Sequence, residues 1–279
     1  MPLLSLVALY VLAVGTAAGR RLDASGLHAF PDDQPPLADV IEHSVNVVSA
    51  PVAAFVLAAI AYRRRGRGSA VAVGLLLAGS NLTTGPLKTA LGAVDLFGGE
   101  DQRPLGAAFF PSGHATAAMS LGLALTIALD STRPRARAGV WFAAVAGVAI
   151  VATSSHHPSD VVGGYLVAGA WAAAATCLLI PSQRATIAAA VRPTRRTWWA
   201  LGALELAALV FWAAHRASVV AAPWADQAIV AAAIVATAVA TPLLALRSPD
   251  GTSRGSAQWH EPLPLSVNER PASGTSRQS

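Results

Sequence analysis

Residues 111–130 read PSGHATAAMSLGLALTIALD, a short polar opening that leads into an apolar run. A helix needs about 20 mostly apolar residues to cross the hydrocarbon core of a membrane. This run qualifies, and other parts of the chain have the same character. The eight predicted spans are residues 2–19, 38–62, 69–92, 112–130, 138–155, 159–180, 199–219 and 227–246. We therefore predict an all-α fold, a polytopic membrane helical bundle.

The composition of the whole chain supports a membrane protein. Of the 279 residues, 54% are hydrophobic and 13% are charged, and the mean hydropathy is +0.50. Soluble globular domains carry about 25% charged residues. So little charge cannot coat a soluble protein of this size, and the apolar residues must face a bilayer. The single cysteine, Cys177, forms no intrachain disulfide and excludes a metal–thiolate or redox pair.

The basic residues between the spans predict the orientation in the membrane. Arginine-rich clusters lie at residues 63–67, 133–137, 184–196 and 247–277. Short basic loops favour the cytoplasm, and the alternation holds through all eight spans if both termini are cytoplasmic. We read the net charge of +5 as this topology and not as nucleic-acid binding. We expect residues 2–19 to be a retained helix, with a signal peptide as the alternative, because Arg20 and Arg21 follow the apolar run instead of preceding it.

Three polar blocks lie at the predicted outer ends of the spans. Lys88, the only lysine, is near the end of the third span; PSGH at 111–114 opens the fourth; and HHPSD at 156–160 separates the fifth from the sixth. Taken alone, each block has a structural explanation, as a helix cap, a snorkelling lysine or a chance spacing. Because spans three to six have short or moderate connections, their outer ends can converge on one site.

The residues of these blocks suit a phosphate ester. Unpaired N–H groups at a helix start, here at Ser112 and Gly113, can hold an anion. The imidazole of His114 can protonate a departing alkoxide. Asp160 follows His156 by one helical turn, so it can hold one nitrogen of that imidazole while the other attacks phosphorus.

The PSGH block, the later HHPSD block and the upstream lysine together resemble the type 2 phosphatidic acid phosphatase family, within the superfamily that includes vanadium haloperoxidases. The resemblance covers about residues 80–175. It implies a six-helix phosphatase-like core over residues 1–180. Two additional transmembrane helices would then occupy residues 181–247, and we expect residues 248–279 to be a disordered cytoplasmic tail.

The resemblance also implies a role for each residue of the blocks. His156 would be the nucleophile that forms a phosphohistidine, Asp160 its orienting partner and His114 the general acid. The residues implied to line the phosphate pocket are Lys88, Ser112 and Gly113. No cofactor or metal is implied. His157 falls on a variable position of the family and is left out of the predicted site.

The chain departs from the family pattern where two arginines are expected. The first block calls for Arg seven residues after Lys88, where Asp95 stands, and the third block calls for Ser-Arg at Ala149 and Ile150. Arg103 is the only cationic residue between Lys88 and the second block. We expect its Gly-rich loop to fold over the pocket, so that Arg103 becomes a replacement phosphate ligand.

These observations favour a hydrolase, an integral membrane phosphatase without a metal. It would cleave a phosphomonoester or pyrophosphate of a lipid at the extracytoplasmic face of the cell membrane. The alternative is a catalytically silent relative that binds anionic lipid headgroups or a membrane partner. The missing arginines favour this alternative, whereas retention of both histidines and the aspartate opposes it. A transporter is less favoured, because we find neither an internal repeat nor a pair of broken helices.

Other polar residues inside the predicted spans are weaker candidates. Glu42, His43 and Asn46 lie near the outer end of the second span and are expected to line the pocket or to contact its histidines. Asn81 and Thr84 share a helical face and are expected to pack between helices.

Overall fold

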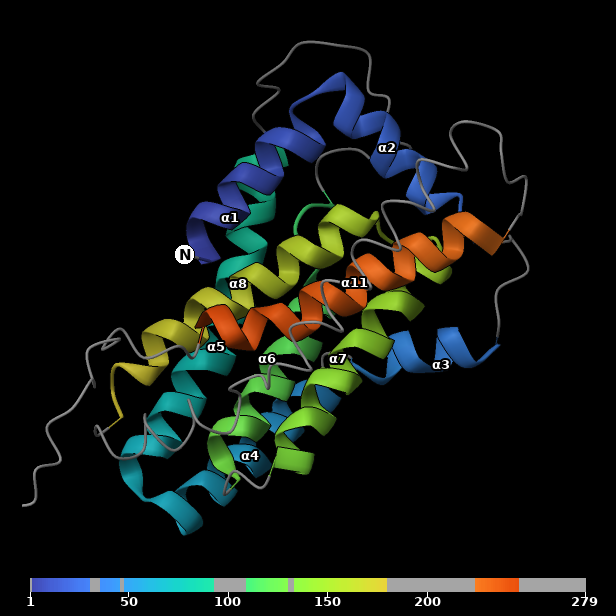
Figure 1. Ribbon diagram of the computed structural model, residues 1–279. Coiled ribbons are helices and arrows are strands. Elements are labelled where there is room, and N and C mark those ends of the chain that lie inside the picture. Colours follow the sequence, from blue (N-terminus) through green and yellow to red (C-terminus); the bar gives the residue numbers. More distant parts are fainter. Residues whose placement is uncertain are drawn as a thin grey trace, which may run out of the picture. The chain divides into compact units, whose positions relative to one another are not determined.

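The computed structural model describes residues 2–30, 36–45, 48–92, 109–129, 133–179 and 224–245 (Figure 1). These residues form nine α-helices and one π-helical segment, without a β-strand, so the all-α prediction is confirmed for this part of the chain. All of them belong to one compact unit, Met1–Arg247. The elements are α1 Pro2–Leu9, η1 Tyr10–Val14, α2 Ala17–Leu27, α3 Pro36–Ser44, α4 Ser49–Arg65, α5 Arg67–Gly92, α6 Gly113–Ala128, α7 Arg133–Ala152, α8 Pro158–Thr176 and α11 Trp224–Ala245.

The number of helices that can cross a membrane is smaller than expected. Within the described ranges, one helix is long and apolar enough to do so by itself, namely Arg67–Leu91 of α5. Two bent pairs, α1 and η1 with α2 and α3 with α4, pass the same test if each pair is one span. The described part thus offers one to three candidate spans. Three of the expected spans correspond to apolar helices of fewer than 18 residues, Gly113–Ala128, Ala138–Ala152 and Asp226–Pro242.

The first predicted span is broken near Thr16. The axes on either side differ by 88°. The Thr16 hydroxyl caps α2 by accepting a hydrogen bond from the Gly19 N–H at 2.9 Å, while the Arg20 guanidinium donates to the carbonyls of Val14 at 3.0 Å and Gly15 at 3.3 Å. These contacts satisfy the backbone groups that a helix break exposes. The expectation of unbroken helices is wrong here, and again between α3 and α4, which differ by 56°.

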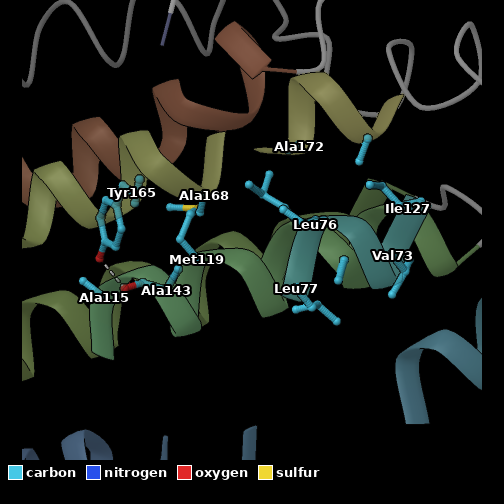
Figure 2. Close-up of a cluster of buried hydrophobic side chains, with 14 of the residues drawn as sticks. Val73, Leu76, Leu77, Ala115, Met119, Ile127, Ala143, Tyr165, Ala168 and Ala172 are labelled. Carbon is cyan, nitrogen blue, oxygen red and sulfur yellow. Dashed lines mark hydrogen bonds between the residues drawn. The ribbon is translucent and has the colours of Figure 1, made fainter. Parts of the chain in front are cut away.

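Helices α5, α6, α7 and α8 share the main apolar core (Figure 2). The core residues labelled in Figure 2 are Val73, Leu76 and Leu77 of α5, Ala115, Met119 and Ile127 of α6, Ala143 of α7, and Tyr165, Ala168 and Ala172 of α8. Small residues bring the helices close: α6 and α7 touch at Gly122 and Gly139, where an added Cβ would overlap the other backbone.

Polar side chains also join α5 to α6. Asn81 Nδ2 donates to Ser120 Oγ at 3.3 Å, and Thr84 Oγ1 donates to Thr116 Oγ1 at 3.4 Å. As predicted, Thr84 is buried between the two helices, whereas Asn81 is exposed although it hydrogen-bonds to α6. These contacts fix the end of α5 that carries Lys88 next to the start of α6.

Several predicted features lie outside the described residues. They are the span at 199–219, the tail at 248–279, the loop that carries Arg103, and Asn46. Of the two additional C-terminal helices expected within 181–247, the described residues include α11.

Candidate active site

The starts of α6 and α8 meet, and this contact brings two of the polar blocks together. As predicted, α6 begins at Gly113 with Ser112 as its cap, and α8 begins at Pro158. The Ser112 N–H donates to the Asp160 carbonyl at 2.8 Å. Gly164 of α8 faces this segment so closely that an added Cβ would lie 2.7 Å from the Ser112 carbonyl oxygen. The absence of a side chain at Gly164 therefore allows the two blocks to touch.

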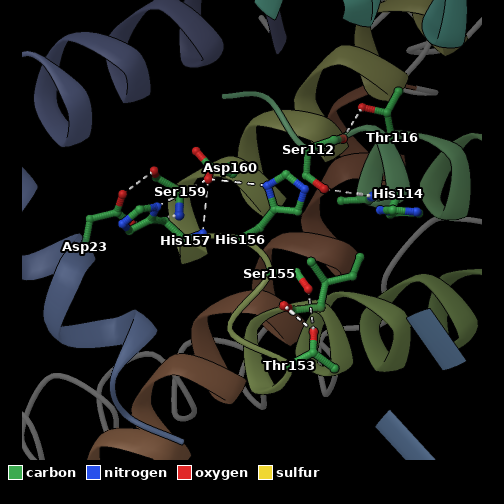
Figure 3. A network of polar contacts seen from close by, with 12 residues as sticks. Asp23, Ser112, His114, Thr116, Thr153, Ser155, His156, His157, Ser159 and Asp160 are labelled. Carbon is green, nitrogen blue, oxygen red and sulfur yellow. Dashed lines mark hydrogen bonds and ion pairs between the residues drawn. The ribbon is translucent and has the colours of Figure 1, made fainter. Parts of the chain in front are cut away.

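The Asp160 carboxylate lies between two imidazoles (Figure 3). Its Oδ2 is 3.5 Å from Nδ1 of His156 and 3.5 Å from Nδ1 of His157. The same oxygen accepts a hydrogen bond from the His157 backbone N–H at 3.0 Å. All three side chains are buried. The predicted neighbours His156 and Asp160 are thus brought together, although the described residues give Nδ1 of His156 no hydrogen bond at this distance.

The ring of His157 is the part of this arrangement that the sequence analysis left out. It is fully buried beside Asp160, with which it forms the capping box at the start of α8. Its adjacency to His156 was the available signal. Position alone could not tell which of the two successive histidines faces His114.

His114 faces His156 from the start of α6. The ring centroids are 6.5 Å apart and the planes are inclined by 70°. The His114 side chain is 42% exposed, whereas His156 is buried with its ring edge against Phe109 at a centroid distance of 5.7 Å. An added Cβ on Gly113 would meet no atom within 4 Å. One imidazole is therefore accessible, the other is sheltered, and open space lies beside the helix start.

Lys88 approaches the same place from α5. Its side chain is half-buried, and one turn earlier the hydrogen bond between Thr84 and Thr116 joins α5 to the first turn of α6. The structure thus gathers Lys88, the start of α6 and the histidines, while Arg103 lies outside the described residues. Within those residues no three His, Cys, Asp or Glu side chains are grouped so that they could hold a metal ion.

Of the weaker candidates from the second predicted span, Glu42 reaches the site. It is 5% exposed, and its Oε1 lies 3.9 Å from Nδ1 of His114. His43 points elsewhere: it is exposed and contacts Asp39, one turn earlier in α3. The expectation of a contact with the pocket histidines is thus met by Glu42 and not by His43.

Asp23 is a third buried carboxylate near the site, after Asp160 and Glu42, and the sequence analysis did not single it out. Its two oxygens accept hydrogen bonds from the Ser159 N–H at 2.9 Å and the Ser159 hydroxyl at 2.6 Å. Asp23 of α2 thereby holds the first turn of α8, where a negative charge is favoured by the helix dipole. An acidic residue close after an apolar run was the only signal for it in the sequence.

Comparison with known proteins identifies one relationship. Residues 69–184 match the family model described as the PAP2 superfamily. The matched segment contains all three polar blocks, and the resemblance described from them is confirmed over this range. No curated protein and no solved structure matches the chain.

Proposed function

Because residues 69–184 form a PAP2 superfamily domain, we propose that this protein is a membrane phosphatase with His156 as nucleophile and His114 as general acid. Membership of this superfamily suggests a phosphatase, and its members are typically metal-independent. The observation that carries the residue assignment is the meeting of two imidazoles from different blocks beside one buried carboxylate.

The nucleophile is the nitrogen of His156 that faces away from Asp160. With Nδ1 turned toward the carboxylate, the lone pair on Nε2 is available to attack phosphorus. A P–N bond forms as the P–O bond to the leaving group breaks, and His114 gives its proton to the departing oxygen. Water then attacks the phosphohistidine: a P–O bond forms as the P–N bond breaks, His114 takes up the proton of that water, and inorganic phosphate leaves His156 as a neutral imidazole.

The separation of the two rings supports this sequence of steps. Reacting atoms in a productive complex lie about 3–3.5 Å apart, and a general acid must lie within about 2.6–3.2 Å of the atom it protonates. The breaking P–O bond lies between these two contacts. The attacking nitrogen of His156 and the proton-donating nitrogen of His114 should therefore be about 6–8 Å apart. The observed centroid distance of 6.5 Å is on this scale.

The phosphate oxygens would be held by the start of α6 and by Lys88. Free backbone N–H groups at a helix start, together with the positive end of its dipole, suit the equatorial oxygens of a phosphoryl group. Lys88 supplies a full positive charge. We propose that Arg103 supplies a second one in place of the arginines expected at other positions.

A lipid substrate at the extracytoplasmic face is proposed on two grounds. Exposed large apolar side chains, among them Leu4, Leu12 and Phe55, cover α1, η1 and α4 and suit contact with acyl chains. Lys88 lies 21 residues along α5 from Arg67, so about 30 Å separates the site from the arginine cluster. That length matches the hydrocarbon core and supports a site on the side opposite the basic loops.

A catalytically silent, lipid-binding relative remains the alternative, and one observation favours it. Ala149 and Ile150, where the family pattern calls for Ser-Arg, are 5% and 1% exposed and pack in apolar clusters. No cation can therefore reach the phosphate from that turn of α7. The phosphatase proposal therefore requires Lys88 and Arg103 to supply enough positive charge to hold the phosphate.

Hydrolysis by the purified protein tests the two proposals. Lipid monophosphates and diphosphates would be assayed with and without a chelator, beside a His156→Ala control. We expect chelator-resistant release of phosphate by the wild type, an acid-labile phosphoenzyme, and loss of both in the variant. Binding of phosphatidate vesicles without turnover would reject the enzyme in favour of the silent relative.

A further inference from the structure

Helix α3 brings a carboxylate to the imidazole of His114. Small side chains allow the approach: Ala117 and Ala118 of α6 and Ala146 of α7 pack with Val45, just after the end of α3. Glu42 is buried by this packing. A buried carboxylate is costly unless it has partners, so its contacts show what holds it there.

The two oxygens of Glu42 have different surroundings. Oε2 accepts hydrogen bonds from the Thr153 hydroxyl at 2.5 Å and the Ser155 hydroxyl at 3.1 Å. Both hydroxyls belong to the connection between α7 and α8, directly before His156. With Oε2 held in this way, Oε1 faces Nδ1 of His114 at 3.9 Å.

The charges around His114 give Glu42 a distinct role. Among the described groups whose charge acts on His114, three can carry positive charge: Lys88 of α5, His156 of the α7–α8 connection and His43 of α3. Glu42 is the negative one. It offsets the positive charge of Lys88, which would otherwise oppose protonation of the imidazole.

We propose that Glu42 is a positioning residue that orients His114 and stabilises its protonated form until the leaving group departs. The inference rests on the proposed phosphatase function. Nδ1–H of His114 faces the Glu42 carboxylate, and the proton on Nε2 passes to the leaving oxygen as the P–O bond breaks. Glu42 stays ionised throughout. The hydroxyls of Thr153 and Ser155 hold the carboxylate in place. The α7–α8 connection therefore carries the nucleophile His156 and, through Glu42, also positions the general acid His114.

The dependence of the reaction on the leaving group tests this role. An alkyl phosphate needs a proton on its departing oxygen, whereas a nitrophenyl phosphate releases a stable phenolate. kcat/KM is the appropriate measure, because it reports the steps through leaving-group departure and not the later hydrolysis of the phosphoenzyme. For Glu42→Gln we expect a loss of about 30-fold or more with the alkyl ester and less than about 3-fold with the nitrophenyl ester.

Three further variants separate positioning from structural support. Asp39→Asn removes an exposed carboxylate from the same helix and should change neither rate. Thr153→Val should reproduce part of the selective loss, and Thr153→Ser should restore the wild-type ratio of the two rates. In a His114→Asn background, Glu42→Gln should have no further effect on that ratio.

The measured rates support or overturn the proposed role of Glu42. An equal loss on both esters, or a selective loss that persists without His114, overturns the proposed role of Glu42 while the phosphatase stands. An unchanged alkyl rate in a folded Glu42→Gln protein overturns it too. If the wild type hydrolyses neither ester, the proposed function fails and this inference fails with it.

Discussion

Replacing Gly164 with alanine should separate the two histidines without touching either of them. A Cβ at this position would lie 2.7 Å from the Ser112 carbonyl oxygen and 2.9 Å from the Thr116 nitrogen. These two atoms are joined by the hydrogen bond that closes the first turn of α6, at 3.0 Å. The added Cβ would therefore clash with backbone atoms, which cannot adopt another rotamer as a flexible side chain could.

The size of the effect follows from this geometry. An ordinary Cβ contact begins near 3.4 Å, so α8 must move from α6 by about 0.7 Å in a close-packed interior. Overpacking of this kind costs about 1–3 kcal/mol of stability. A displacement near 1 Å at reacting groups can lower the rate about a hundredfold. We therefore expect Gly164→Ala to retain its fold and to lose about 30- to 100-fold in kcat.

Gly74→Ala is the matched control for this substitution. It also lies inside a helix, but an added Cβ there meets no atom within 4 Å. Its activity should equal that of the wild type, and its stability should rise by about 0.5–1 kcal/mol. Phosphate release and thermal unfolding would be measured on both proteins. Wild-type activity in Gly164→Ala would refute the argument that the close approach of α6 and α8 holds the histidines in place.

Three other outcomes are expected. Asp23→Ala removes the acceptor of two hydrogen bonds at the start of α8, so it should lower the free energy of unfolding by about 1–3 kcal/mol; an unchanged melting temperature would contradict this. Arg103→Ala should lower phosphatase activity at least tenfold, which corresponds to about 1.4 kcal/mol in the transition state. Arg64 is exposed near the end of α4, and Arg64→Ala should leave the activity unchanged. Equal rates for the two variants would reject Arg103 as a phosphate ligand. In a background without Cys177, an impermeant thiol reagent applied to intact cells should label Gly106→Cys and not Arg64→Cys, and the reverse pattern would invert the orientation.

Local features of the fold were predictable because their causes are local. Ser112 is a good helix cap, and Pro158 favours a first helical turn, so the starts of α6 and α8 could be placed from the sequence. The break at Thr16 could not be placed, because a hydropathy average identifies an apolar run but does not detect a capping hydroxyl within it. Arg20, read only as a topology signal, in fact donates to the carbonyls at the break.

The sequence allowed the motif residues of the candidate site to be proposed, but not the carboxylates from distant helices that contact them. His114, His156 and Asp160 follow a recognisable spacing, so they could be proposed as site residues from the sequence alone. Glu42 and Asp23 reach the site through tertiary packing, from helices distant in the sequence. No periodicity or motif links them to the histidines. Glu42 could be named as a weaker candidate because it is an ionisable group in an apolar span, but the sequence could not tell that it, and not His43, contacts His114.

The apolar packing of Ala149 and Ile150 leaves no place for a charged side chain at the turn of α7 where the family pattern calls for Ser-Arg. At Ile150, which is 1% exposed, arginine would bury an unpaired charge in the core before it reached any phosphate. An engineered second cation for the phosphate would therefore be easier to introduce in the loop around Arg103 than in α7.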